Sequence, residues 1–403
     1  MTEAILVLGD DVRAFLAVVR SLGRLGLEVH AAPSDWTSPA LRSRYVHQTH
    51  SLPSYAASPE AWETRLLELA GNYSIGMILP CSDSSLAKLH HAGRLGIAQL
   101  GVPGPAAMAA FTDKAATRAL AESLGIPVAA GELLTPETDA DALTGRLGLP
   151  MAIKPRASYA LRDVVEKRFA RIVKSRAELR KTLAAHAHED YLAESFFVGD
   201  GVGVSVIARQ GTILQAYQHR RLLEASETGA STSRISETIN PELLRSVEAM
   251  TGATKLHGVA MFEFRRDRKT GDHILLEVNP RFWGSLPLAL EAGVDFPVML
   301  HDLLSGKPVH VTCDYRVGVR KSDLLGEYYR LVGGRWKGDF LKMSFSAAAV
   351  AIRTLTPGAW DSWAADDPQP FVQERKELLR RIRDALGKRL PKADPRPRPR
   401  PLG

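Results

Sequence analysis

The sequence predicts an α/β fold class, because short apolar runs alternate with helical patterns along its first hundred residues. Ala4–Leu8 is an apolar run typical of a buried strand, and the apolar residues from 15 to 22 recur at helical spacing. Further strand patterns occur at 28–31 and at Ile75–Pro80, and Ser82 is well placed to open the helix that follows. This βαβ rhythm implies a parallel sheet with helices on its faces.

The turn after the first strand argues against a dinucleotide-binding site, which is common in such sheets. It has the sequence GDDVR at 9–13. A dinucleotide site would need Gly-x-Gly-x-x-Gly at this point, because the glycines let the backbone approach the pyrophosphate. The sequence therefore argues against a nicotinamide or flavin dehydrogenase.

Glycine and proline mark a domain junction at 101–105, where the sequence is GVPGP. Beyond it, Thr112 is the expected N-cap of a helix that carries Lys114. Ser175 is expected to cap another helix, which runs to about residue 185. Strands are expected at 152–154, 172–173 and 191–198, and a hairpin is expected from 204–209 and 212–218.

The positive charge of the chain is concentrated near its C-terminal end. Residues 375–403 hold eleven basic and three acidic side chains, a net +8, so residues 1–374 sum to −1. A nearly neutral body argues against a dedicated nucleic-acid site there. The basic segment 375–403 is a candidate for weak binding to an anionic partner, and its last part, 391–403, alternates proline with arginine and is expected to be disordered.

Cysteine is too scarce for a disulfide framework or a cysteine-rich zinc site, since only Cys81 and Cys313 are present. The N-terminus lacks a basic region followed by a long apolar run, so no signal peptide is expected. A cytoplasmic location fits both observations.

Chemically, the most informative segment is a hairpin of two strands at 258–265 and 273–278, joined by a polar turn. Alternate residues of a strand share one face. The face expected to be core holds Phe262, Phe264, Ile274, Leu276 and Val278. The opposite face is expected to gather Met261, Glu263, Arg265, Leu275, Glu277 and Asn279.

If the turn centres near Thr270, Glu263 lies opposite Glu277 with Asn279 close by. Two adjacent carboxylates repel each other without a cation, and oxygen ligands suit Mg²⁺ that bridges to substrate phosphates. The alternative is a solvated face with two unrelated acids. Arg281 can point to the same side, where its guanidinium would hold a phosphoryl group or an acyl phosphate, unless it forms a structural ion pair.

The hairpin and three earlier blocks together resemble the ATP-grasp enzymes. The resemblance extends over residues 1–305 and is closest in style to biotin carboxylase, carbamoyl-phosphate synthase and the amino-acid or peptide ligases. The blocks keep the family's order and spacing, which is more specific than any one of them. They are FTDK at 111–114, AIKP at 152–155, ESFFVG at 194–199, and MFEF at 261–264 with LEVNPR at 276–281.

The resemblance implies a domain organisation of α/β character, with α+β architecture in the ATP-grasp part. An N-terminal Rossmann-like pre-ATP-grasp domain would occupy 1–105 and a two-lobed ATP-grasp domain 106–305. The implied parts of the latter are a small lobe at about 114–190, a hinge at 194–199 and a large lobe at 200–305. An α/β extension at 306–390 and the basic tail at 391–403 would follow.

The resemblance also implies roles for individual residues. Lys114 and Lys154 would contact the ATP phosphates. The hinge would bind adenine through Glu194 and through the backbone of Ser195 and Phe197. The implied Mg²⁺ ligands, with Mn²⁺ as a substitute ion, are Glu263, Glu277 and Asn279. Arg281 would stabilise the acyl phosphate, and Arg220 would lie near the γ-phosphate and the substrate.

Two departures from the family pattern concern nucleotide binding. The family usually has a mobile glycine-rich loop after the second lysine, whereas residues 156–163 contain no glycine. Arg156 and Ser158 are candidates to replace it. Many relatives carry a glutamate for the ribose hydroxyls after the hinge, and here only Asp200 is a candidate.

The resemblance implies an ATP- and Mg²⁺-dependent carboxylate–amine ligase that forms an amide or peptide bond through an acyl phosphate and releases ADP. Amino acids or small peptides are the expected substrates, and a homodimer is an expected assembly. The alternatives are a carboxylase-like enzyme that uses carboxyphosphate and a non-catalytic ATP-binding regulator.

Overall fold

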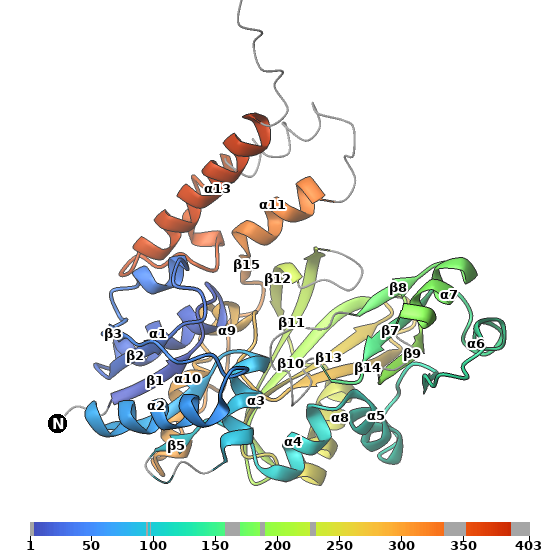
Figure 1. The fold of residues 1–403 in the computed structure, drawn as a ribbon, viewed down its shortest axis with the longest axis horizontal. Coiled ribbons are helices and arrows are strands. Elements are labelled where there is room, and N and C mark those ends of the chain that lie inside the picture. The colour runs from blue at the N-terminus through green and yellow to red at the C-terminus, as the bar shows by residue number, and fades with distance from the viewer. Residues whose placement is uncertain are drawn as a thin grey trace, which may run out of the picture.

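The computed structural model describes residues 4–93, 96, 98–157, 170–185, 190–225, 231–333 and 352–387. Within these residues the strands form three sheets (Figure 1). One sheet is parallel and two are antiparallel, so the predicted α/β class with an α+β part is confirmed. The predicted phosphate-loop residues 158–163 and the basic tail at 391–403 lie outside the described residues.

The parallel sheet is formed by the N-terminal part of the chain, with strand order β3-β2-β1-β4-β5. Ile5 and Val7 face helix α1, whereas Leu6 and Leu8 pack on the other side with α2 and α3, as the alternation of side chains along a strand requires. The elements are β1 (Ala4–Leu8), α1 (Ala14–Arg24), β2 (Glu28–Ala32), the 3₁₀ turn η1 (Pro39–Arg42), β3 (Gln48–Thr49), α2 (Pro59–Asn72), β4 (Ile75–Pro80), α3 (Asp83–Ala92) and β5 (Gln99–Leu100).

The smallest antiparallel sheet has the order β6-β9-β7-β8 and carries two helices. Its small core joins Met151 and Ile153 to Leu143 and Leu179 of those helices. The elements are β6 (Gly131–Leu133), α6 (Ala140–Leu147), β7 (Met151–Pro155), β8 (Arg171–Val173), α7 (Arg176–Ala185) and β9 (Tyr191–Ser195). We refer to this unit as the small lobe; it lies on the right in Figure 1.

The six-stranded sheet has the order β14-β13-β10-β11-β12-β15 and lies between the parallel sheet and the small lobe (Figure 1). Val202, Val204 and Val206 face α4 and α8, while Ile207 faces α9 and α10, which also pack on α1. The elements are α4 (Pro105–Phe111), α5 (Lys114–Ser123), β10 (Asp200–Arg209), β11 (Thr212–Glu224), β12 (Ser231–Glu237), α8 (Pro241–Thr254), β13 (Gly258–Arg266), β14 (His273–Asn279), α9 (Leu286–Ala292), α10 (Phe296–Leu304) and β15 (Arg320–Ser322).

The turn between β10 and β11 agrees with its sequence prediction, whereas the start of α5 and the end of β9 differ from theirs. Gln210 and Gly211 both have positive φ, as a two-residue hairpin turn between β10 and β11 requires. The prediction for Thr112 was wrong, because its hydroxyl donates to Met108 O at the end of α4, and Asp113 accepts the backbone N–H groups that open α5. The strand predicted at 191–198 ends at Ser195.

A C-terminal unit of α11 (Leu324–Gly333), the 3₁₀ turn η2 (Pro357–Ala359) and α13 (Gln369–Gly387) packs back on the N-terminal part. Asp367, which is buried, links the two. It accepts hydrogen bonds from Arg20 Nε at 2.9 Å, Ser43 Oγ at 2.6 Å and the Arg44 backbone N–H at 2.9 Å. Segments more than 300 residues apart in sequence therefore share one buried polar network.

A second buried network in this unit gives a pH-dependent contribution to stability. Burial raises the pKa of Glu374 on α13 from 4.5 to about 8, and Asp323 and Asp361 add to the shift while Ser362 and Arg13 oppose it. The folded chain therefore binds this proton more tightly than the unfolded chain. Its contribution is complete below pH 4.5 and is lost as the pH rises through about 8, with a slope of up to about 1.4 kcal/mol per pH unit.

Glutamine has nearly the shape of a protonated glutamate but does not titrate. Glu374→Gln should therefore reduce the loss of stability as the pH rises. We expect the variant to melt at a higher temperature than the unmodified chain at pH 8 and at a similar one at pH 5. Glu377→Gln, on the exposed side of the same helix, is the matched control and should leave the profile as it is. An identical pH profile for Glu374→Gln and the unmodified chain would show that Glu374 is ionised when folded.

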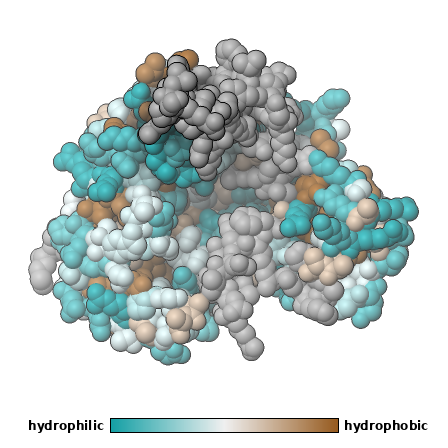
Figure 2. Space-filling view, turned by 45° about the horizontal axis from the view of Figure 1, so that its top comes forward, coloured by the Kyte–Doolittle hydropathy of each residue, from teal (hydrophilic) through white to brown (hydrophobic). Residues whose placement is uncertain are grey.

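The surface is polar and mixed. Figure 2 shows one face as mostly hydrophilic, with hydrophobic residues in small separate groups, as is usual for a globular surface. Among the helices described, none combines the length and the apolar character needed to cross a bilayer.

Candidate active site

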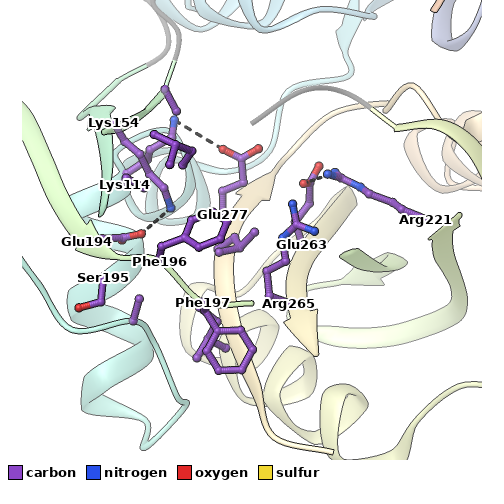
Figure 3. A pocket seen from close by; sticks show the side chains of 16 residues that line it. Lys114, Lys154, Glu194, Ser195, Phe196, Phe197, Arg221, Glu263, Arg265 and Glu277 are labelled. Carbon is purple, nitrogen blue, oxygen red and sulfur yellow. Dashed lines mark hydrogen bonds and ion pairs between the residues drawn. The ribbon is translucent and has the colours of Figure 1, made fainter. Parts of the chain in front are cut away.

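A pocket lies between the small lobe and the six-stranded sheet, where β7 and β9 face β13 and β14 (Figure 3). Apolar side chains, among them Ala152, Ile172 and Leu276, form part of its wall. The polar and aromatic residues that Figure 3 labels around it are Lys114, Lys154, Glu194, Ser195, Phe196, Phe197, Arg221, Glu263, Arg265 and Glu277.

The β13–β14 hairpin places two carboxylates side by side. Glu263 is the register partner of Glu277, as the sequence predicts. The register then shifts, so that Phe264 pairs with Leu275 and Leu276 is the extra residue of a β-bulge. Glu277 is 36% exposed and Glu263 14% exposed, so both remain within reach of a ligand.

The bulge corrects three predicted side-chain directions. Leu275 is buried in the core with Phe262 and Phe264, although strict alternation places it on the acidic face. Leu276 and Ile274, predicted to be core, line the pocket. Because a bulge lets consecutive residues point to one side, Leu276 and Glu277 both face the ligand space.

Two lysines lie across the pocket from these acids. Lys114 is the first residue of α5, and its Nζ lies 3.7 Å from Glu277 Oε2. Lys154, on β7, forms an ion pair with Glu194 on β9 at 2.5 Å. Loss of water contact raises the pKa of Glu277, but Lys114 and Lys154 outweigh that effect and the net shift is downward. Glu277 is therefore held as a carboxylate.

Glu263 is balanced by a different cation. Arg221, on β11, donates to Glu263 Oε2, and the Asn279 side-chain amide donates to Glu263 Oε1 at 3.3 Å. Burial raises the pKa of Glu263, and Arg221 opposes this shift without cancelling it. The two neighbouring carboxylates are thus shifted in opposite directions, because each faces a different set of charges.

Arg281 connects this pocket with the parallel sheet. Its Nη2 donates to Asn279 Oδ1 at 3.0 Å, and its Nε donates to Asp83, the first residue of α3. Asp83 lies just after β4, at the carboxyl edge of the parallel sheet, where ligands commonly bind in such folds. Arg281 is therefore at the boundary between the pocket and the N-terminal unit.

The comparisons with known proteins agree with this geometry. Residues 187–323 match the family model described as ATP-grasp in the biosynthetic pathway with Ter operon. The chain contains an ATP-grasp domain. The matched segment includes the predicted hinge, the β13–β14 hairpin and Arg281.

Among curated proteins, the chain is 30% identical over 193 residues to a D-alanine–D-alanine ligase of Neisseria gonorrhoeae. The match covers 45% of this chain and 62% of that ligase, so the chain spans less than two thirds of its relative.

Two solved structures share the fold. An L-amino acid ligase from Bacillus licheniformis superposes with a TM-score of 0.58 and 17% identity, covering 75% of this chain and 74% of that one. A biotin carboxylase from Campylobacter jejuni superposes with a TM-score of 0.61 and 16% identity, covering 79% and 74%.

Two predicted residues of the ATP-grasp domain lie away from the pocket. Arg220 points to the opposite face of β11, where it pairs with Glu237 and lies 3.7 Å from Asp200. Asp200 is also paired with Arg268. Neither Arg220 nor Asp200 lines the pocket as described, so the structure does not place them with the other predicted residues.

In the predicted hinge, 194–199, backbone groups of Ser195 and Phe196 already form hydrogen bonds within the protein. The Ser195 N–H donates to Ala130 O at 2.8 Å, and its hydroxyl donates to Leu147 O at 2.9 Å. The N–H of Phe196 donates to Pro150 O at 3.3 Å. Phe197, the next residue along the chain, also lines the pocket.

Arg221 and Arg265 also line the pocket and were missed as site residues. A signal for Arg221 is present in β10, whose glycines 201 and 203 alternate like one face of a strand. A Cβ on Gly201 would lie 2.5 Å from Arg221 Cδ, so glycine leaves the path by which Arg221 reaches Glu263. A search for glycines opposite arginines on neighbouring strands would have favoured Arg221 over Arg220.

Proposed function

We propose that the chain is an ATP- and Mg²⁺-dependent carboxylate–amine ligase that forms an amide or peptide bond through an acyl phosphate. The observation that carries the proposal is the pairing of Glu263 with Glu277 on adjacent strands, facing Lys114 and Lys154 across one pocket. This arrangement supports the proposal, because carboxylates that can bind a metal ion lie beside lysines that can bind phosphate, as transfer of a γ-phosphoryl group requires.

The residues present fit a magnesium site. Glu263, Glu277 and the side-chain oxygen of Asn279 offer oxygen ligands only, which Mg²⁺ prefers, and Mn²⁺ would accept the same set. When bound there, the ion would neutralise charge on the β- and γ-phosphates. Arg221 and Lys114 pair with these two acids and offset their mutual repulsion.

The remaining residues would bind and orient the substrates. Lys114 and Lys154 would contact phosphate oxygens. The apolar walls beside Phe197, with Glu194 at the hinge, would hold the adenine. Arg281 would hold the acyl phosphate, and we assign to Arg221 the position near the γ-phosphate that the sequence suggests for Arg220.

The chemistry follows from the reactivity of carboxylates. A carboxylate oxygen attacks the γ-phosphorus, the bond from that phosphorus to the β,γ-bridging oxygen breaks, and ADP leaves. The amine then attacks the acyl carbon, phosphate leaves and the amine loses a proton. The protein contributes by fixing the reacting groups and by stabilising the developing charge.

The test is ADP release by the full chain with a panel of carboxylates and amines, in which amino acids and short peptides come first. We expect ADP and phosphate only when both a carboxylate and an amine are present. ADP formation with bicarbonate alone would favour the carboxyphosphate alternative. Nucleotide binding without turnover on any pair would favour a non-catalytic regulator, and AMP with pyrophosphate would contradict the acyl-phosphate mechanism.

A cytoplasmic location is part of the proposal, supported by the two unpaired cysteines, Cys81 and Cys313. The homodimer and the anionic partner of residues 375–403 stay predictions from sequence, as do the domain boundaries at 105 and 305.

A further inference from the structure

Three side chains with metal-binding atoms gather on the parallel sheet, in a part of the molecule that the ligase chemistry does not use. Glu28 and His30 are two residues apart on β2 and so share one face. His47 precedes β3, and its backbone N–H donates to Val29 O at 2.8 Å, which anchors it beside them. One ligand atom from each side chain lies within 4.8 Å of the other two.

The distances within this cluster approach those of a zinc site. His30 Nε2 lies 2.9 Å and His47 Nε2 lies 3.3 Å from Glu28 Oε1. In a tetrahedral site with Zn²⁺–ligand bonds near 2.0–2.1 Å, neighbouring ligand atoms are about 3.3 Å apart. The glutamate side chain is 32% exposed and that of His47 is 56% exposed, so an ion can enter from solvent and keep water as its fourth ligand.

His50 supplies the hydrogen bond that usually orients a metal-binding histidine. Its Nε2 lies 2.7 Å from Nδ1 of His30, and both rings are buried. The backbone N–H of His50 donates to Ala31 O at 2.8 Å, so its position is set by the strand pairing. His30 is thereby held from behind while its Nε2 points to Glu28 and His47.

The proton arrangement distinguishes two states of the cluster. If His50 donates to His30, then His30 Nε2–H donates to Glu28 and the three groups form a hydrogen-bond relay. If His30 donates to His50, its Nε2 lone pair faces the Glu28 carboxylate, and a cation between them removes the repulsion. The second state is the one in which the donor set is complete for a metal.

We propose that Glu28, His30 and His47 bind one Zn²⁺ ion, with His50 as the positioning residue behind His30. Two imidazole nitrogens and one carboxylate oxygen are a ligand set that zinc accepts readily. The ion joins β2 to the segment that enters β3, an edge strand of two residues that pairs with β2 through His30–Gln48 and Ala31–Thr49. The role of the ion is to stabilise the pairing of β3 with β2 at that edge of the sheet.

The experiment is a zinc titration of untagged, chelator-stripped full chain against a chromophoric chelator, with excess Mg²⁺ present to occupy the acidic pair of the pocket. We expect one zinc per chain and a higher melting temperature with zinc. His47→Ala and Glu28→Gln, both at exposed or half-exposed side chains, should each weaken binding by at least about 10–100-fold, the range for losing a group that only orients a ligand. His310→Ala removes an exposed histidine elsewhere and should bind zinc like the unmodified chain.

Cobalt(II) provides a readout that is independent of the chelator. Binding to two imidazoles and a carboxylate should produce visible d–d absorption that His47→Ala abolishes and His310→Ala retains. The proposal is overturned if the unmodified chain takes up no zinc, which would leave the hydrogen-bond relay only. It is equally overturned if His47→Ala and Glu28→Gln bind zinc as tightly as His310→Ala.

Discussion

Glu277→Gln should lower magnesium-dependent ADP formation by roughly a hundredfold or more, the scale of losing one preorganised charge-stabilising group. The glutamine keeps the size of the side chain but removes the carboxylate that faces Glu263 across the hairpin. It also removes an anion that lies 3.7 Å from Lys114 Nζ, so affinity for ATP in the absence of Mg²⁺ should be unchanged or tighter. The prediction is therefore a split between nucleotide binding and magnesium-dependent turnover.

Glu132→Gln provides the matched control for this variant. Glu132 lies on β6 of the small lobe, is 36% exposed like Glu277, and pairs with Arg146 away from the pocket. Both measurements are made over a series of Mg²⁺ concentrations, together with the melting temperature. Turnover of Glu277→Gln equal to that of the control at limiting Mg²⁺ would remove Glu277 from the proposed site.

Arg281→Lys should depress acyl-phosphate formation far more than nucleotide binding. With hydroxylamine in place of the amine, the acyl phosphate is trapped as a hydroxamate, and hydroxylamine needs little of the amine pocket. A lysine cannot reproduce the two-pronged contact of a guanidinium. We expect the hydroxamate rate to fall by about 10²–10³-fold, with a larger loss in Arg281→Ala, because the interaction is strongest where charge develops.

Asp83→Asn tests whether Arg281 acts on the acyl phosphate or only holds the structure together. The variant weakens the Arg281–Asp83 ion pair but retains the Arg281 guanidinium. If Arg281 acts on the acyl phosphate, Asp83→Asn should retain most of the hydroxamate rate. Equal losses in Asp83→Asn and Arg281→Lys would mean that the pair serves to join the parallel sheet to the pocket. Equal losses of rate and ATP affinity in Arg281→Lys would make Arg281 a ground-state phosphate anchor.

The sequence predicted the parts of the fold that depend on local periodicity. The parallel sheet, the β10–β11 turn and the pairing of Glu263 with Glu277 follow from alternation, helical spacing and turn chemistry. The bulge at Leu276 does not, because an extra residue in a strand has no fixed composition, and it reversed the directions of Leu275 and Leu276.

The misplacement of Arg220 has a related cause. Successive side chains of a strand point to opposite faces of the sheet. Choosing between Arg220 and Arg221 therefore requires the register of β11 with β10 and of β10 with β13. The contacts of Asp367 with Arg20 and Ser43 lie further beyond local reasoning, since more than 300 residues separate the partners. The sequence around Asp367 and around Arg20 contains no local pattern that identifies the partner of either residue.

The buried contacts of Asp367 limit how the molecule can be taken apart. A chain cut before residue 367 would keep Arg20 buried but would lose Asp367, the carboxylate that pairs with it. Removing one side of a buried ion pair costs about 3–5 kcal/mol, a large share of the stability of a typical domain. A chain shortened in this way is therefore expected to lose stability even though it retains every residue that lines the pocket.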